Sequence, residues 1–258
     1  MNVLAIRVVN DVFLRANAAP SDLALWCLHG FADCGAAFAH LFETPLGRRV
    51  RMMAPDLPGF GASPRGDHGG TIADHVATLL GLIEEETPDM KIGLVGHSVG
   101  SVIAAEAARQ LGPRCAGMFS IEGNLTADDA YFSGQAVDYE NAADFKNLFT
   151  NKIWERSADS IILRLYHGGL MQADAGAMWT FGRDVKSYSR DDQPGHVLKA
   201  LDCPVHYFWC ADNTPETTQK FLRDHALPNT EVTGTSHWPM LDAPDKVGAC
   251  LELFFRVG

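Results

Sequence analysis

One serine, Ser98, stands between two glycines in the stretch Gly96-His97-Ser98-Val99-Gly100. A serine on a sharp turn between a strand and a helix is exposed to substrate, and the turn brings other backbone so close that a β-carbon at either glycine would clash. The first N–H groups of the helix lie beneath such a serine, where they stabilise a developing oxyanion. The pattern predicts a nucleophilic serine, provided that the surrounding elements supply this turn.

The residues around Ser98 favour that turn, because an apolar run over 91–96 predicts a buried strand and the Ala-rich stretch 98–112 predicts a helix. Short apolar runs alternate with amphipathic stretches along the chain, which is typical of a mostly parallel sheet with crossover helices. We expect eight strands, the first two forming a hairpin, over 4–9, 12–18, 23–30, 50–56, 91–96, 116–123, 205–210 and 229–235.

Three further helices are expected on this sheet, over 71–86, 215–226 and 244–255, and Thr71 with Asp74 can form a capping box at the start of the first. Residues 125–198 carry helical patterns without a strand, so we expect a helical lid inserted after the sixth strand. The core of this single domain is then 1–124 and 199–258. Four aromatic residues of the lid either line an acyl pocket or form core: Trp154, Tyr166, Trp179 and Phe181.

Three more motifs follow in order: "LHGF" at 28–31, "APDLPGFGAS" at 54–63 and "SHWPMLDAP" at 236–244. Together with the Ser98 motif they make the chain resemble the α/β-hydrolase superfamily over nearly its whole length except the lid. The resemblance implies an α/β fold with a mostly parallel eight-stranded sheet and helices on both faces. It also implies a serine hydrolase.

The resemblance assigns roles to individual residues. Phe31 and Val99 match the donors of the oxyanion-hole amides, and His237 matches the base that takes the proton of Ser98. His29 and His97 are expected to be structural, with His29 holding the oxyanion loop by hydrogen bonds.

The acid that orients His237 has two candidates. The commonest family position falls on Asn213, which carries no charge, and Asp212 stands one place early in "FWCADNTPE". A second group of relatives takes the acid from the end of the sixth strand, where this chain has Glu122 in "FSIEGN". We favour Glu122 over Asp212, against the alternative that Glu122 only caps the first turn of the lid.

The function expected from these residues is hydrolysis of a carboxylic ester or a similar small acyl compound through an acyl-enzyme on Ser98. The same residues serve C–C bond hydrolysis or a cofactor-free oxygenase on this fold. A non-catalytic receptor for a small ligand is the alternative from another class.

Composition limits the partners. A formal net charge of −11 leaves no basic stripe for nucleic acid, and no apolar run reaches the roughly 18 residues of a membrane span. The first residues show no signal-peptide pattern, so we expect a cytoplasmic protein. We also expect no cofactor, no metal and a small-molecule substrate; the sequence does not indicate the oligomeric state.

Overall fold

A single eight-stranded sheet runs through the computed structural model, which describes residues 4–257; residues 1–3 and 258 of the predicted core lie outside it. The strands lie in the order β1-β2-β4-β3-β5-β6-β7-β8. β1 pairs antiparallel with β2, and β2 with β4, while all other neighbours are parallel. The bounds are β1 Ala5–Val9, β2 Val12–Ala16, β3 Leu23–Leu28, β4 Arg51–Pro55, β5 Lys91–His97, β6 Cys115–Ile121, β7 Val205–Cys210 and β8 Asn229–Val232.

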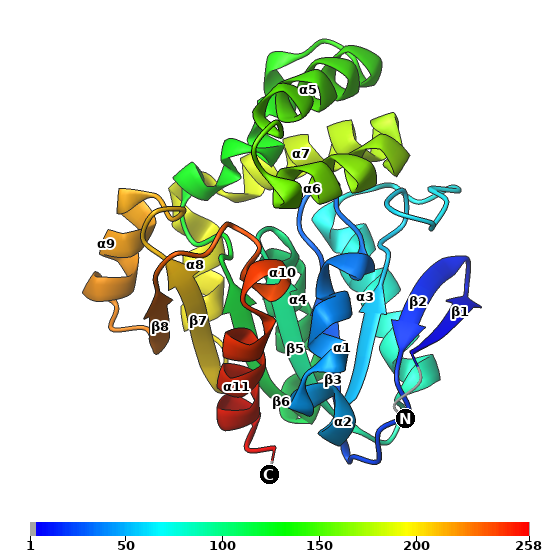
Figure 1. The fold of residues 1–258 in the computed structure, drawn as a ribbon, viewed down its shortest axis with the longest axis vertical. Coiled ribbons are helices and arrows are strands. Elements are labelled where there is room, and N and C mark those ends of the chain that lie inside the picture. Colours follow the sequence, from blue (N-terminus) through cyan, green and yellow to red (C-terminus); the bar gives the residue numbers. More distant parts are fainter. Residues whose placement is uncertain (1–3, 258) are drawn as a thin grey trace.

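Helices cover both faces of this sheet, which confirms the predicted fold class (Figure 1). One face carries α1, α2, α10 and α11, and the other carries α3, α4 and α8; α9 follows β7 at the edge. Their bounds are α1 Ala39–Glu43, α2 Pro45–Arg49, α3 Ile72–Glu86, α4 Gly100–Leu111, α8 Gln193–Lys199, α9 Glu216–Asp224, α10 Pro239–Asp242 and α11 Pro244–Phe255.

Local signals in the sequence determine where α3 begins and where α4 ends. At the start of α3 the Thr71 side chain accepts from the Asp74 N–H, and Asp74 Oδ2 accepts from the Thr71 N–H at 3.0 Å. This confirms the capping box. α4 ends at Gly112, whose φ of 52° lies in the left-handed region that glycine adopts without strain.

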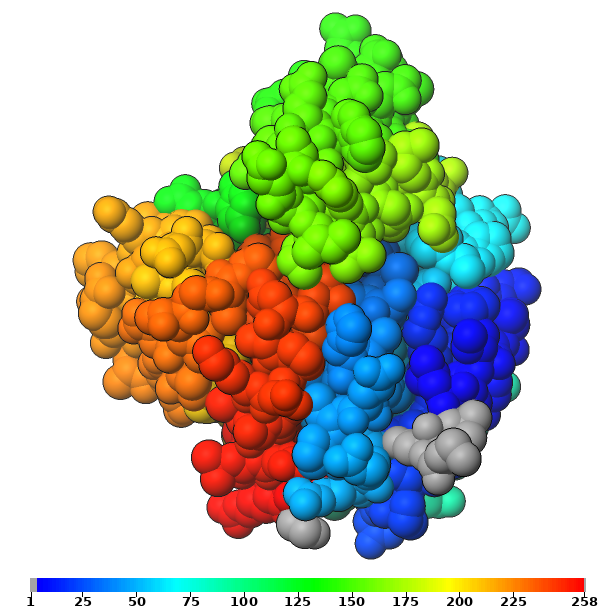
Figure 2. All heavy atoms as spheres, in the orientation of Figure 1, coloured from blue at the N-terminus to red at the C-terminus, as the bar shows by residue number. Residues whose placement is uncertain are grey.

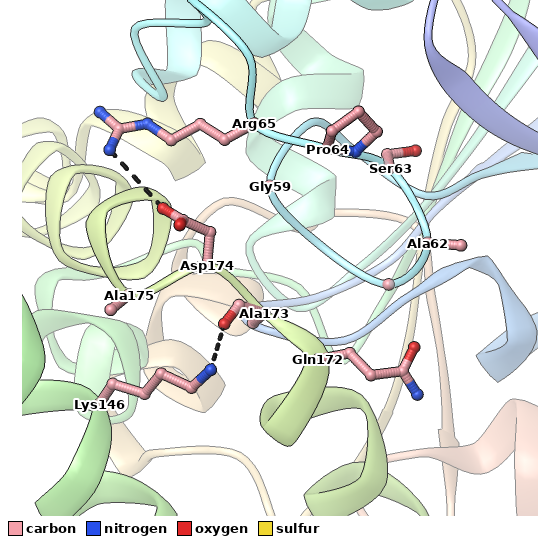
Figure 3. A pocket seen from close by; sticks show the side chains of 11 residues that line it. Gly59, Ala62, Ser63, Pro64, Arg65, Lys146, Gln172, Ala173, Asp174 and Ala175 are labelled. Atoms are coloured by element: carbon pink, nitrogen blue, oxygen red, sulfur yellow. Dashed lines mark hydrogen bonds and ion pairs between the residues drawn. The ribbon is translucent and has the colours of Figure 1, made fainter.

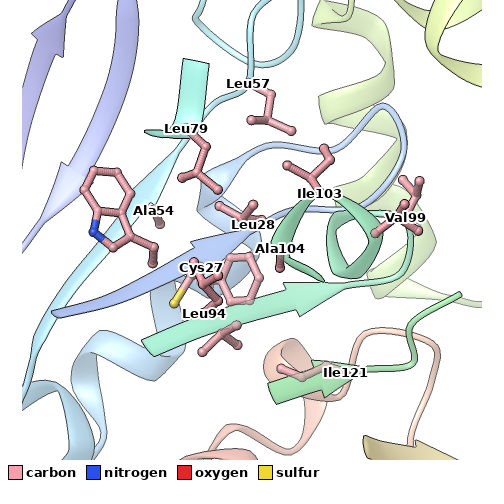
Figure 4. Packing of buried hydrophobic residues seen from close by; sticks show 14 of the residues in the cluster. Cys27, Leu28, Ala54, Leu57, Leu79, Leu94, Val99, Ile103, Ala104 and Ile121 are labelled. Atoms are coloured by element: carbon pink, nitrogen blue, oxygen red, sulfur yellow. The ribbon is translucent and has the colours of Figure 1, made fainter. Parts of the chain in front are cut away.

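Part of the buried core lies between the sheet and the α3–α4 layer (Figure 4). Leu28 and Leu94 project from the central strands toward Leu79 of α3 and Ile103 of α4, and all four side chains are fully buried. Burying such side chains contributes roughly 1.5–3 kcal/mol each. The end of β5, and therefore Ser98, is fixed by this packing.

Residues 125–198 form a helical segment between β6 and β7, which stands over one end of the sheet in green to yellow (Figures 1 and 2). Before α8 it contains η3 Ala127–Tyr131, η4 Ser133–Asp138, α5 Ala142–Arg156, α6 Ile161–Gln172, α7 Ala175–Tyr188 and η5 Arg190–Asp192. α7 is a helix that the sequence analysis did not single out. Its two ends meet, because the Gly195 N–H donates to the Leu125 carbonyl at 2.9 Å.

Within residues 4–257, no helix has both the length and the apolar character needed to span a membrane.

Candidate active site

Ser98 occupies the tight turn that its sequence motif predicts. Its φ of 50° lies in the left-handed region, which costs a residue with a β-carbon roughly 1–2 kcal/mol. A β-carbon on Gly96 would lie 2.4 Å from Ser101 Cα, and one on Gly100 would lie 2.4 Å from the Leu28 carbonyl oxygen. Both flanking residues must therefore be glycine for the end of β5 to turn directly into α4.

Two backbone N–H groups near Ser98, those of Phe31 and Val99, donate no hydrogen bond to another described residue. Both residues are buried, and Phe31 lines the same small cavity as Ser98. The loop that carries Phe31 is held from two sides. His29 Nε2 accepts from the Leu57 N–H at 3.0 Å, as expected, and the Tyr166 hydroxyl donates to the Phe31 carbonyl at 2.9 Å.

His237 follows β8 and lines the cavity at Ser98, which measures only about 10 Å³. The neighbour of the serine, His97, holds the His237 backbone, since its Nε2 lies 2.7 Å from the His237 carbonyl oxygen. A carbonyl only accepts, so Nε2 of His97 carries the proton. Burial lowers the pKa of His97 well below its usual value, which keeps this ring neutral. His97 therefore has a structural role.

Glu122 leaves the end of β6 with a φ of 47° and places its carboxylate beside the imidazole of His237. Its Oε2 lies 3.8 Å from His237 Nδ1. The Glu122 side chain is 2% exposed, and its carboxylate is held by the Cys210 N–H at 2.8 Å and by the Thr214 hydroxyl at 3.2 Å. These two donors fix the position of the carboxylate beside the imidazole.

Asp212, the competing candidate, is not brought to His237. Its side chain is exposed and its Oδ2 lies 4.0 Å from Cys210 Sγ. Asn213, in the commonest family position for the acid, donates to the Thr235 carbonyl at 3.0 Å and lies 3.5 Å from Glu122 Oε1. The structure thus places an amide donor where a carboxylate is usual, and a carboxylate at the end of β6.

Two residues of the helical segment that the sequence analysis did not identify lie over His237. The Tyr131 hydroxyl lies 3.3 Å from His237 Nδ1, and Phe132 lines the cavity at Ser98 with its ring edge-on to the imidazole. Of the four lid aromatics considered above, Tyr166 lines this cavity, Phe181 stacks on Phe31, and Trp154 is exposed. No motif around residues 131–132 signals this contact, since it joins residues over 100 positions apart.

Asp33 was also missed, although it stands two places after Phe31 and lines the same cavity. Its Oδ2 accepts from the Trp238 indole N–H at 2.9 Å, which ties the Phe31 loop to the His237 loop. Burial raises the pKa of Asp33 to about 6, and the hydrogen bonds from Cys34 and Trp238 offset only part of that rise.

A larger hollow lies elsewhere, between the loop 59–65 and the residues joining α6 to α7 (Figure 3). It measures about 490 Å³ and shares no lining residue with the cavity at Ser98. Its cations are engaged: Arg65 lies 3.6 Å from Asp174, and Lys146 donates to the Ala173 carbonyl (Figure 3). In the part of the chain described, no group of three or more His, Cys, Asp or Glu side chains is arranged to hold a metal ion.

Solved structures share this fold. A mutant of the N-acyl homoserine lactonase AidH, with N-hexanoyl homoserine bound, has a TM-score of 0.77 at 17% identity over 98% of this chain and 97% of that chain. A thermophilic esterase from Thermogutta terrifontis has a TM-score of 0.74 at 18% identity, over 95% and 93%. A variant of AqdC in complex with its substrate, the Pseudomonas quinolone signal, has 0.77 at 17% identity, over 99% and 100%.

No curated protein sequence matches the chain. The model of the alpha/beta hydrolase family matches residues 27–249, a range that contains Ser98, Glu122 and His237. With this match and the sheet order described above, the chain belongs to the alpha/beta hydrolase family.

Proposed function

We propose that this chain is a serine hydrolase that cleaves a carboxylic ester or a similar small acyl compound. One observation carries the proposal: Ser98 and His237 line one cavity, and the Glu122 carboxylate stands beside Nδ1 of His237. A nucleophile, a base and an acid in this relation make up the catalytic group of serine hydrolases.

The proposed reaction begins when His237 Nε2 takes the proton of the Ser98 hydroxyl as its oxygen attacks the acyl carbon. The resulting oxyanion accepts hydrogen bonds from the N–H groups of Phe31 and Val99, which have no other described partner. Collapse expels the alcohol, which receives the proton from His237. Water, activated by His237, then releases the acid from the acyl-enzyme.

Glu122 is the proposed acid. Accepting a hydrogen bond from Nδ1–H fixes the tautomer of His237 in which Nε2 is free to act as the base, and the negative charge stabilises the imidazolium that forms. At 3.8 Å the contact is longer than a hydrogen bond. We therefore expect the two groups to approach each other when substrate is bound.

The helical segment is the proposed lid. A cavity of about 10 Å³ holds at most one water molecule, so substrate enters only if Tyr131 and Phe132 move away from His237. A lid lined by aromatic rings favours small or medium acyl groups over long lipid chains. A series of p-nitrophenyl esters of increasing chain length tests this, with activity highest for the short and medium members.

The proposal is tested with a fluorophosphonate probe and a panel of an ester, a thioester, a lactone, a diketone and an alkylquinolone. The probe should label Ser98, and Ser98→Ala should lose ester turnover by about 10⁴-fold or more. Ser189→Ala is the matched control, because its hydroxyl has no partner among residues 4–257. Retained turnover in Ser98→Ala would overturn the proposal.

The remaining alternatives give different results in the same panel. A cofactor-free oxygenase consumes dioxygen with the alkylquinolone, and a C–C hydrolase cleaves the diketone in preference to the ester. A non-catalytic receptor binds a panel member tightly without turnover. Each of these outcomes contradicts ester hydrolysis as the function.

A further inference from the structure

A second hollow of about 180 Å³ adjoins the cavity at Ser98. The two share three wall residues, namely Asp33, Tyr166 and Trp238. The cavity at Ser98 is too small for more than the reacting carbonyl, so the rest of a substrate must occupy adjoining space. This hollow lies on the other side of a wall made by only three side chains.

The hollow is lined mostly by apolar groups, including Ala36, Ala37, Leu165 and Leu241. Tyr166 and Trp238 add two aromatic rings, with centroids 4.8 Å apart and planes at 42°. The Tyr166 and Trp238 polar atoms are engaged with the Phe31 carbonyl and the Asp33 carboxylate. What these residues offer a ligand in the hollow is therefore the ring surface, which attracts cations.

Asp33 is the only carboxyl group on these walls among the described residues. It is 6% exposed, and none of the ion pairs formed within residues 4–257 includes it. Buried carboxylates are normally paired with a cation. Arg15 does not serve, because it pairs with Asp56 at 2.5 Å. The pKa of Asp33 is raised mainly by this burial.

We propose that this hollow binds an ammonium group in the alcohol part of the ester, with Asp33 as the counter-charge and the rings of Tyr166 and Trp238 as cation-binding surfaces. The proposal rests on the proposed function, since it places the leaving group of the Ser98 reaction. The net charge of −11 favours the approach of cationic substrates in general.

The test compares two esters of the same shape, acetylcholine and 3,3-dimethylbutyl acetate, which differ by one positive charge. The parent should prefer acetylcholine in kcat/KM by about ten-fold or more. Asp33→Asn should remove most of this preference, measured as the ratio of kcat/KM for the two esters within the same variant. Glu43→Gln is the matched control and should keep the preference, because it removes an exposed charge 4.0 Å from His40, which lines the hollow.

A second variant tests the proposal independently, in case Asp33→Asn does not fold. Leu165 is 53% exposed at the hollow, so Leu165→Lys adds a positive charge there without disturbing the core, and Leu165→Gln is its neutral control. Leu165→Lys should lower the preference for acetylcholine, and Leu165→Gln should not. Equal rates for the two esters in the parent, or equal losses on both esters in Asp33→Asn, overturn the proposal.

Failure of the proposed function is distinguishable from failure of this inference. Choline binding is measured by calorimetry on the parent and Asp33→Asn, independently of turnover. In one outcome the fluorophosphonate does not label Ser98, but choline binds and Asp33→Asn lowers its affinity about ten-fold. The cation site is then supported and the proposed hydrolase function is wrong. If Ser98 is labelled and choline does not bind the parent, the proposed hydrolase function is supported and the proposed cation site is wrong.

Discussion

The hydroxyl of Tyr131 lies 3.3 Å from Nδ1 of His237, closer than the Glu122 carboxylate, whose Oε2 lies 3.8 Å from the same nitrogen. A neutral phenol is a better donor than acceptor, so it favours the tautomer whose proton is on Nε2. Glu122 favours the opposite tautomer, with the proton on Nδ1. The two neighbours of this nitrogen therefore favour opposite tautomers, and only the tautomer that Glu122 favours leaves Nε2 free to accept a proton.

Removing the phenol should relieve this competition. We expect Tyr131→Phe to raise kcat/KM for a short ester by about three-fold, because one hydrogen bond to the unproductive tautomer is lost. Steady-state rates on one ester measure it, with Tyr139→Phe as the control in the same segment. A large loss of activity in Tyr131→Phe would show that the phenol supports His237.

The two candidate acids are separated by matched substitutions. Glu122→Gln should lower kcat by up to about 10⁴-fold, because the buried carboxylate beside His237 loses its charge. Asp212→Asn should stay within a few-fold of the parent, since its side chain is exposed. Thermal melts of both variants exclude unfolding, and the reverse ranking of kcat would assign the role to Asp212.

Position 100 must be glycine because the backbone of β3 passes too close for a β-carbon. A β-carbon there would lie 2.4 Å from the Leu28 carbonyl oxygen, so Gly100→Ala should lower the free energy of unfolding by at least about 2 kcal/mol. Gly81→Ala is the control, because a β-carbon in that exposed part of α3 meets nothing within 4 Å. Urea unfolding should show Gly81→Ala slightly more stable than the parent.

His75 should make the protein sensitive to acid. It is fully buried against Phe181 and Phe60, its two ring nitrogens have no hydrogen-bond partner among the described residues, and burial lowers its pKa to about 3. In the unfolded chain it binds a proton near pH 6.5. Its contribution to stability is therefore complete above pH 6.5 and is lost as the pH falls toward 3.

His75→Phe should remove that loss. Between pH 7 and pH 4.5 the parent should lose about 2 kcal/mol of unfolding free energy more than His75→Phe does. Urea unfolding at both pH values measures the difference, and His40→Gln, with a half-exposed ring, should behave as the parent. Parallel pH curves for the parent and His75→Phe would contradict the proposed cause.

Most of the fold could be predicted because its signals are local. Most strands of the sheet are short apolar runs, and α3 begins at a capping box that four consecutive residues determine. The ends of the strands were predicted less well. β8 ends at Val232 rather than at residue 235, because it is an edge strand and Gly234, with a φ of 72°, turns the chain away. α7 was missed because its amphipathic pattern is interrupted by Gly176 and Gly182.

The site could be predicted only where a motif marks it. Ser98 and His237 stand in such motifs, and Glu122 was a candidate because it follows a recognisable strand; the structure places it beside His237. The contacts of Tyr131 with His237 and of Asp33 with Trp238 join residues 106 and 205 positions apart. They arise from tertiary packing of loops, which no local pattern of residues encodes.

The helical segment leaves and rejoins the sheet at one point, since the Gly195 N–H donates to the Leu125 carbonyl. Its distal helices can therefore lengthen, shorten or be exchanged over generations without moving β6 or β7. Tyr131 and Phe132 stand only a few residues beyond this junction, so they would survive such exchanges. Proteins descended from this chain can therefore change the distal helices of the segment while the arrangement of residues around Ser98 and His237 stays the same.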